Sequence, residues 1–361
     1  MRIFQLLTTA KHGDAVGNHA FALNDILKEA GYETGIFAEH IAANVKKTEV
    51  LSWERMPALT PEDIIIYHMS TGSRLNRRFI KFNCRKVMDY HNITPAEFFE
   101  GFDDTSRMLC RQGRRELQAM AGKVDYCLAD SEYNRQELLD MGFDCDVDVL
   151  PIVIPFEDYE REPDADIINK YSDGRTNVLF VGRLAPNKCQ EDIIRAFACY
   201  KKYYDSGARL ILIGSCEEKS IYLSMLRDYV NEAGAEDVEF LSELRFPEIL
   251  AFYRTASLFL CMSEHEGFCV PLLEAMAFKV PVITYGAAAV PGTMGGSGIV
   301  LGKKDPLVTA GIMDRVMKDD MLRAQIIEGQ DRRLKDFSYE NTRERFLTLI
   351  KAFAEKGEST R

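Results

Sequence analysis

The stretch SLFLCMSEHEGFCVPLLEAMAFKVPVITY, residues 257–285, carries the pattern that decides the fold. It predicts a buried strand at 258–261, a short acidic loop, a helix at 270–278 and a second apolar strand. In a parallel α/β sheet, such a unit directs its loop and helix N-terminus at the crevice beyond the strand ends, where ligands bind. Glu266 lies in the loop and Glu274 in the helix, eight residues further on. We therefore expect both carboxylates to face one bound ligand.

Composition narrows the class of protein. The chain has 361 residues, 46% of them hydrophobic, and a formal net charge of −11. This length supports two domains with separate cores, and the acidic balance argues against nucleic acid as a partner, because no positive field would collect phosphates. The nine cysteines form no C-x-x-C pair, which favours reduced thiols over a disulfide framework or a zinc site. The pattern shows neither a signal peptide nor a membrane-spanning run, so we expect a cytoplasmic protein.

Two series of strand–loop–helix units predict two Rossmann-like α/β domains, at 1–165 and 166–337, with prolines and charges in the linker between them. The first predicted strand runs into a polar loop that contains Gly13 and Gly17. That loop either lets a ligand approach the backbone or is a plain turn.

Two histidines lie at or just past the carboxyl ends of predicted strands. The strand at 63–68 ends in His68, and the strand at 86–90 runs into His91 and Asn92. Carboxyl ends of parallel strands line the crevice, so either histidine is a candidate site residue. A structural role in a hydrogen-bonded loop or core is the alternative; the turn after Asn92 favours a site residue at His91.

Two basic stretches stand out in this acidic chain. The first extends from Arg74 to Lys86 without an acidic residue, and the second, from Arg107 to Arg115, places arginines at helical i, i+4 spacing. They form either a solvated helix face or an amphipathic surface that meets anionic lipid or a phosphate-bearing acceptor.

A second loop is suited to a diphosphate. Gly182 ends the predicted strand at 177–181, and Arg183 and Lys188 follow before a helix. Glycine admits phosphate oxygens close to the backbone, while guanidinium and ammonium groups neutralise them. Gly214 ends the next strand in the same way. Exposed loop cations without a ligand are the alternative.

Three motifs in this order resemble the family 4 glycosyltransferases of the GT-B fold. They are VGRLAPNK at 181–188, SEHEGFCVPLLEAMA at 263–277 and AVPGTMGG at 289–296. The resemblance implies two doubly wound parallel-sheet domains that face a cleft, with a final helix at 338–361 packed back on the first domain. The chain departs from the family pattern at Cys269 and Gly292, where glycine and glutamate are usual. Cysteine is small and keeps its backbone N–H, so a phosphate contact there should survive.

The resemblance implies transfer of a hexose, with retention, from a GDP- or UDP-sugar to a glycan or polyprenyl-linked acceptor. The leaving phosphate would accept the acceptor's proton in a front-face attack, so that neither a metal nor a cofactor is required. The catalytic residues would be His91 near the reacting carbon, Arg183 and Lys188 on the diphosphate, and Glu266 on the sugar hydroxyls, with Glu274 on the ribose. The donor site would also include Gly13, Gly17, Gly182, Gly214, Gly267, Phe268, Cys269 and Val270, and the acceptor side His68, Asn92 and Ser131.

The expected setting is the synthesis of a cell-surface polysaccharide or lipopolysaccharide, either free in the cytoplasm or peripheral on the inner face of the membrane. Two other functions stay open: a soluble transferase for a small acceptor, and a catalytically silent protein that binds nucleotide sugars. The presence of Arg183, Lys188, Glu266 and Glu274 together argues against the silent protein.

Overall fold

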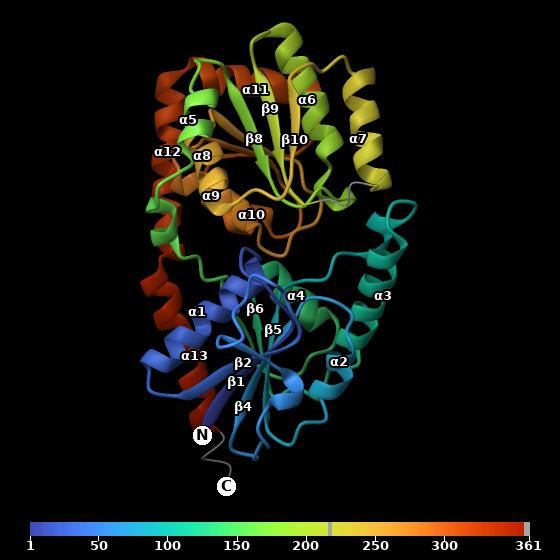
Figure 1. Cartoon of the computed structure of the whole chain (residues 1–361), viewed down its shortest axis with the longest axis vertical. Helices are drawn as coiled ribbons and strands as arrows, with labels where there is room; N and C mark the ends of the chain where they lie inside the picture. The colour runs from blue at the N-terminus through green and yellow to red at the C-terminus, as the bar shows by residue number, and fades with distance from the viewer. Residues whose placement is uncertain (216–218, 357–361) are drawn as a thin grey trace. The chain divides into compact units, whose positions relative to one another are not determined.

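A computed structural model describes residues 1–215 and 219–356, and it contains two parallel sheets in two compact units (Figure 1). The first unit comprises Met1–Ala96, Thr105–Pro155 and Phe337–Arg361, and the second Glu97–Asp104 and Phe156–Asp336. Two doubly wound sheets confirm the predicted fold class. The units divide after Pro155, whereas the sequence pattern predicts a boundary at 165/166. The end of the predicted final helix, 357–361, lies outside the described residues.

The first sheet has seven parallel strands in the order β3-β2-β1-β4-β5-β6-β7. The strand order reverses between β1 and β4, which makes this pair a topological switch point. Strand β4 is buried along its whole length, as parallel strands covered on both faces usually are. The strands are β1 (Arg2–Ala10), β2 (Glu33–Ile41), β3 (Val50–Ser52), β4 (Ile64–Met69), β5 (Arg85–Tyr90), β6 (Tyr126–Ala129) and β7 (Val147–Val149).

Helices cover both faces of this sheet. On one face, Phe346 and Ile350 of the last helix pack with Leu23 and Ile26 of the first, and the two helices lie side by side in Figure 1. The Arg85 guanidinium stacks over a third apolar side chain of the last helix, the Phe353 ring, at 4.1 Å. The main helices are α1 (Ala15–Glu29), α2 (Arg74–Phe79), α3 (Asp104–Gln118), α4 (Glu132–Asp140) and α13 (Tyr339–Lys356).

The second sheet has six parallel strands in the order β10-β9-β8-β11-β12-β13, with its switch point between β8 and β11. The strands are β8 (Asn177–Val181), β9 (Arg209–Ile213), β10 (Val238–Leu241), β11 (Leu258–Cys261), β12 (Val282–Tyr285) and β13 (Ile299–Leu301). The helices are α5 (Ala165–Tyr171), α6 (Gln190–Tyr203), α7 (Ile221–Glu232), α8 (Phe246–Thr255), α9 (Val270–Ala277), α10 (Val290–Met294), α11 (Pro306–Lys318) and α12 (Asp320–Leu334).

Among the helices in the described part of the chain, none combines the length and the apolar character that crossing a bilayer requires.

Candidate active site

Lys188 and Glu266 join the two motif loops of the second unit. The loops leave β8 and β11, the two strands at the switch point. Lys188 Nζ lies 2.6 Å from each carboxylate oxygen of Glu266, whose side chain is buried. Burial works against the Lys188 ammonium, but the attraction of Glu266 outweighs it and raises the pKa of the lysine. The structure thus brings together two residues that stand 78 positions apart in the chain.

Further hydrogen bonds hold the same two loops in register. Asn187 Nδ2 donates to the carbonyl of His265 at 3.0 Å, and the backbone N–H of Glu264 donates to the carbonyl of Asn187 at 2.9 Å. The Lys188–Glu266 pair is therefore held by its flanking backbone as well as by its own charges.

Arg183 belongs to the same loop as Lys188, and its side chain is exposed. Its guanidinium lies over the Phe99 ring, 5.7 Å from the ring centre. The preceding Gly182 packs against Gly214 at the carboxyl ends of β8 and β9. A Cβ atom at Gly214 would lie 1.9 Å from the Gly182 carbonyl oxygen, so any side chain there would push the two strand ends apart. The two glycines thus serve the close approach of the backbones.

Glu274 lies on α9 in a different environment from Glu266. Its carboxylate accepts hydrogen bonds from Tyr159 Oη at 3.1 Å and Tyr253 Oη at 2.6 Å. Burial raises the pKa of Glu274, and the two phenol donors oppose that rise in part. One glutamate of the motif is therefore paired with a cation, and the other with two neutral donors. Its expected contact with a ribose stays a prediction.

The segment between the two glutamates contains Gly267, Phe268, Cys269 and Val270. Cys269 adopts a left-handed conformation, with φ 72°, and immediately precedes Val270, the first residue of α9. The Phe268 carbonyl accepts a hydrogen bond from Thr293 Oγ1 at 2.5 Å, which ties this segment to α10.

The second departure from the family pattern, Gly292, is exposed on α10, and a Cβ atom there would meet open space. Its carbonyl accepts a hydrogen bond from Arg333 Nη2 at 2.6 Å. The local packing therefore leaves room for the glutamate that is usual in the family.

In the first unit, Gly13 and Gly17 frame the start of α1. Gly17 lies in the first turn of the helix, where its N–H donates to the Asp14 carboxylate at 3.2 Å. A Cβ atom at Gly17 would lie 2.1 Å from the Lys11 carbonyl oxygen, so only glycine fits this close turn. The Gly13 N–H donates to Asn18 Oδ1 at 3.1 Å.

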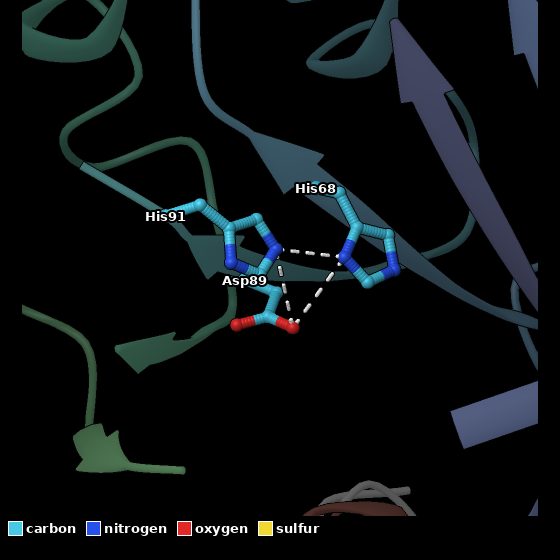
Figure 2. Close-up of side chains that lie close together, drawn as sticks. All are labelled: His68, Asp89 and His91. Atoms are coloured by element: carbon cyan, nitrogen blue, oxygen red, sulfur yellow. Dashed lines mark hydrogen bonds and ion pairs between the residues drawn. The ribbon is translucent and has the colours of Figure 1, made fainter. Parts of the chain in front are cut away.

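The His91 ring is buried at the carboxyl edge of the first sheet, and its side chain is 1% exposed. Its Nδ1 lies 2.9 Å from Asp130 Oδ1. Figure 2 shows its other ring nitrogen, Nε2, facing His68 Nδ1, which lies 2.9 Å away. Both ring nitrogens are therefore engaged in this conformation. The expected contact of His91 with the donor sugar stays a prediction.

His68 belongs to the same buried network. Its Nε2 lies 2.8 Å from Gln5 Oε1, and its register partner on β5 is Asp89. The Asp89 carboxylate accepts a hydrogen bond from His19 of α1 at 3.0 Å. The sequence pattern identifies the two histidines on strands but misses Gln5, His19, Asp89 and Asp130. Asp89 stands two residues before His91, and this D-x-H spacing is the one signal for it in the sequence.

Asn92 and Ser131, expected on the acceptor side, both contact Asn134 of α4. Asn92 Nδ2 donates to Asn134 Oδ1 at 2.7 Å, and Ser131 Oγ caps α4 by accepting from the Asn134 N–H at 3.2 Å. Asn92 has φ 68°, a left-handed conformation. The Asn92 contact fixes the turn that follows β5, and the Ser131 contact starts α4 after β6.

Most of the first basic stretch is engaged within the protein. Arg74 pairs with Glu39, and Arg77 with Glu116 at 3.0 Å. On α3, by contrast, Arg111 and Arg115 are exposed, and the Met108 side chain between the basic residues is 66% exposed. Arg74 and Arg77 are also exposed, but a carboxylate partner offsets the charge of each.

Comparison with known proteins agrees with the motifs. Residues 162–333 match the model of the family described as "Glycosyl transferases group 1". A D-inositol 3-phosphate glycosyltransferase of Acidothermus cellulolyticus is 31% identical over 50% of this chain and 42% of its own length. A Campylobacter jejuni enzyme named as an N-acetyl-D-galactosaminyltransferase for a diNAcBac-PP-undecaprenol-linked acceptor is 26% identical over 48% and 47%. The chain thus spans less than half the length of these two curated relatives.

The structure of Anabaena Alr3699/HepE in complex with UDP-glucose covers 98% of this chain and 100% of its own, with a TM-score of 0.75 and 17% sequence identity. At that identity the likeness shows a shared fold. The family match covers the part of the chain that contains all three motifs. Residues 162–333 therefore belong to the glycosyl transferases group 1 family, which confirms the resemblance that the motifs indicate.

Proposed function

We propose that the chain is a retaining glycosyltransferase that moves a hexose from a UDP- or GDP-sugar to a glycan or lipid-linked glycan acceptor. The observation that carries this proposal is the Lys188–Glu266 ion pair at the switch point of the second sheet. The two side chains lie at the switch point, where an open α/β sheet binds its ligand, and this position supports a role for Lys188 on the diphosphate and for Glu266 on the sugar hydroxyls. The family match of the surrounding residues supports the same reaction class.

In the proposed reaction, the bond between the anomeric carbon and the diphosphate oxygen breaks as negative charge grows on the leaving group. Arg183 and Lys188 stabilise that charge. They therefore lower the free energy of the transition state more than that of the bound substrate, and the barrier falls. The acceptor hydroxyl oxygen bonds to the same face of the carbon, and its proton passes to the leaving phosphate. With two cations in place, the transfer needs no divalent metal.

The relatives support a donor and two classes of acceptor. The structural neighbour holds UDP-glucose, which favours a UDP-sugar here, and the relatives' names mention an inositol phosphate and an undecaprenol-linked glycan. We propose the lipid-linked glycan of a cell-surface polysaccharide or lipopolysaccharide, with α3 meeting an anionic membrane through Arg111, Arg115 and Met108. A soluble transferase for a small phosphorylated acceptor is the second candidate, which the inositol phosphate relatives favour.

A panel of UDP- and GDP-sugars, tested for thermal stabilisation and then for transfer, examines the proposal. A donor at a hundred times its Kd should add about 2.7 kcal/mol to the free energy of unfolding. Binding without transfer to either acceptor class would favour the silent nucleotide-sugar-binding protein. Activity that a chelator abolishes and Mn²⁺ restores would contradict the metal-free reaction.

A further inference from the structure

Lys304 follows β13 and joins two segments of the second unit that lie far from it in the chain. Its Nζ donates to Glu264 Oε1 at 2.8 Å and to Asp192 Oδ2 at 3.0 Å, across 40 and 112 positions of sequence. The lysine side chain is 13% exposed. Burial disfavours its ammonium, but the hydrogen bonds to the two carboxylates outweigh burial and raise the pKa of Lys304. The side chain is therefore a cation that two acidic groups share.

Both acidic partners belong to the segments that carry the Lys188–Glu266 pair. Glu264 stands two residues before Glu266 in the loop that leaves β11. Its backbone N–H donates at 2.9 Å to the carbonyl of Asn187, the neighbour of Lys188. Asp192 lies in the first turn of α6, which begins two residues after Lys188. One ammonium thus bonds a side chain from the loop of Glu266 and another from the helix that follows the loop of Lys188.

The ends of β12 and β13 hold Lys304 in this position. Tyr285 ends β12 and is the register partner of Leu301, which ends β13. The Lys304 ammonium lies 4.9 Å from the centre of the Tyr285 ring, close enough for a cation–π contact. A ring and two carboxylates, from three separate segments, therefore orient the ammonium.

The two carboxylates depend on Lys304 to different degrees. Asp192 has a second cation, Arg195, at 3.3 Å. Within residues 1–215 and 219–356, by contrast, Lys304 is the one basic residue that pairs with Glu264. The backbone hydrogen bonds of α6 also hold Asp192 in place, whereas Glu264 lies in a loop. Loss of the ammonium should therefore release the loop of Glu266 and leave α6 where it is.

Repulsion between the two carboxylates would drive that release. Cys189 Sγ and one carboxylate oxygen each of Asp192 and Glu264 lie within 4.8 Å of one another. Two negative charges at that separation repel each other unless a cation neutralises them. Lys304 supplies the cation from within the chain. Without it, the Glu264 side chain, which is already 46% exposed, would turn into solvent and move its loop.

We propose that Lys304 is a positioning residue for the donor sugar. By neutralising Glu264, it holds the loop between β11 and α9 in the place where Glu266 faces the sugar hydroxyls. The inference rests on the proposed function, in which Glu266 binds those hydroxyls. It does not extend to the nucleoside, because Glu274, the residue proposed for the ribose, lies on α9 and is bonded by two tyrosines.

The test compares each nucleotide sugar with its own nucleoside diphosphate by isothermal titration calorimetry of the full chain: UDP-glucose with UDP, and GDP-mannose with GDP. Lys304→Met removes the ammonium and keeps a side chain of similar length. We expect the Kd of the nucleotide sugar to rise about 10-fold, as for the loss of one hydrogen bond to a charged group, while the Kd of the nucleoside diphosphate stays within about twofold. Lys303→Met, at the neighbouring exposed lysine, is the matched control and should leave both constants unchanged.

Two more variants separate a lost charge from a lost shape. Glu264→Gln should give the same rise in the Kd of the nucleotide sugar. Combining it with Lys304→Met should add little, because both changes act through one ion pair. Lys304→Arg restores a cation and should recover part of the affinity. Fully additive losses in the double variant would show that the two residues act separately, and would contradict the proposal.

The melting temperature of each variant, measured in parallel, shows whether the ion pair also stabilises the fold. A Lys304→Met protein that melts at a lower temperature but keeps the native Kd for the nucleotide sugar would overturn the proposal and leave Lys304 a purely structural tie. Equal weakening of nucleotide sugar and nucleoside diphosphate would overturn it as well. Binding of none of the four ligands by the native protein would contradict the proposed function itself and, with it, this role of Lys304.

Discussion

The two sheets differ in where they place ionisable residues near their switch points. In the second unit, Lys188 and Glu266 stand in loops beyond the strand ends, and the lysine side chain is 19% exposed. In the first unit, His68 and Asp89 stand within the strands β4 and β5, and their side chains are completely buried. A side chain in a loop can exchange its protein partner for a ligand. A side chain buried within a sheet cannot be freed from its partners unless the sheet unfolds. We therefore expect substitutions in the second group to cost activity and substitutions in the first to cost stability.

The largest effect should come from His19→Ala, which removes a ring that bonds both Asp89 and the Val153 N–H. Without the neutral ring, the buried Asp89 carboxylate loses a donor and the Val153 N–H loses its acceptor, at about 1–3 kcal/mol each in the free energy of unfolding, measured by urea denaturation. His40→Ala, an exposed histidine of the same unit, is the control and should change that value by less than about 0.5 kcal/mol. Equal losses in both variants would show that the network does not stabilise the unit.

Lys188→Ala should come next, with its loss in kcat/KM rather than in folding. If the ammonium stabilises the leaving diphosphate as a lost oxyanion donor would, the donor-dependent rate falls about 100- to 1000-fold, or roughly 2.7–4 kcal/mol. Lys202→Ala removes an exposed lysine of the same unit and should keep the native rate. Full activity of the Lys188→Ala variant would contradict the assignment of Lys188 to the donor site.

The second unit could be predicted from the sequence more fully than the buried network of the first unit. The bounds of β8 and β11 agree with the strands predicted at 177–181 and 258–261, because each is a short apolar run followed closely by glycine or a polar loop. The residues proposed to bind the donor in the second unit lie within two sequence motifs, so a pattern along the chain is enough to identify them as candidates.

The buried network could be predicted only in part, because it depends on which strands are neighbours. Gln5 and Asp130 lie on opposite sides of the His68–His91 pair, and they meet it only after β1, β4, β5 and β6 are placed side by side. Pairing between distant strands is information that a single sequence does not display.

Binding of α3 to a membrane would add a surface contact that belongs to neither switch point. Arg111→Gln with Arg115→Gln removes two exposed cations, each worth about 1 kcal/mol near an anionic bilayer, so binding to phosphatidylserine-rich vesicles should weaken about 30-fold. Lys47→Gln with Arg55→Gln makes the same charge change on exposed residues elsewhere in the unit and should have a smaller effect. A native protein that does not bind such vesicles at low salt would dismiss the membrane contact.

The smallest effect tests whether the Glu274 carboxylate, on α9, is retained for ligand binding although it lowers stability. Burial raises the pKa of Glu274, so its ionised form disfavours folding, and this cost appears as the pH rises from the unfolded value of about 4.3 through the folded pKa. Glu274→Gln keeps an acceptor for Tyr159 and Tyr253 but carries no charge. The variant should therefore gain about 1 kcal/mol in unfolding free energy over the native protein at about pH 8, and less at about pH 5, while it binds the donor more weakly. Glu236→Gln, an exposed glutamate of the same unit, should show neither change. A Glu274→Gln protein that is less stable at both pH values would mean that the carboxylate holds the two tyrosines in place, and that its position reflects packing rather than a ligand.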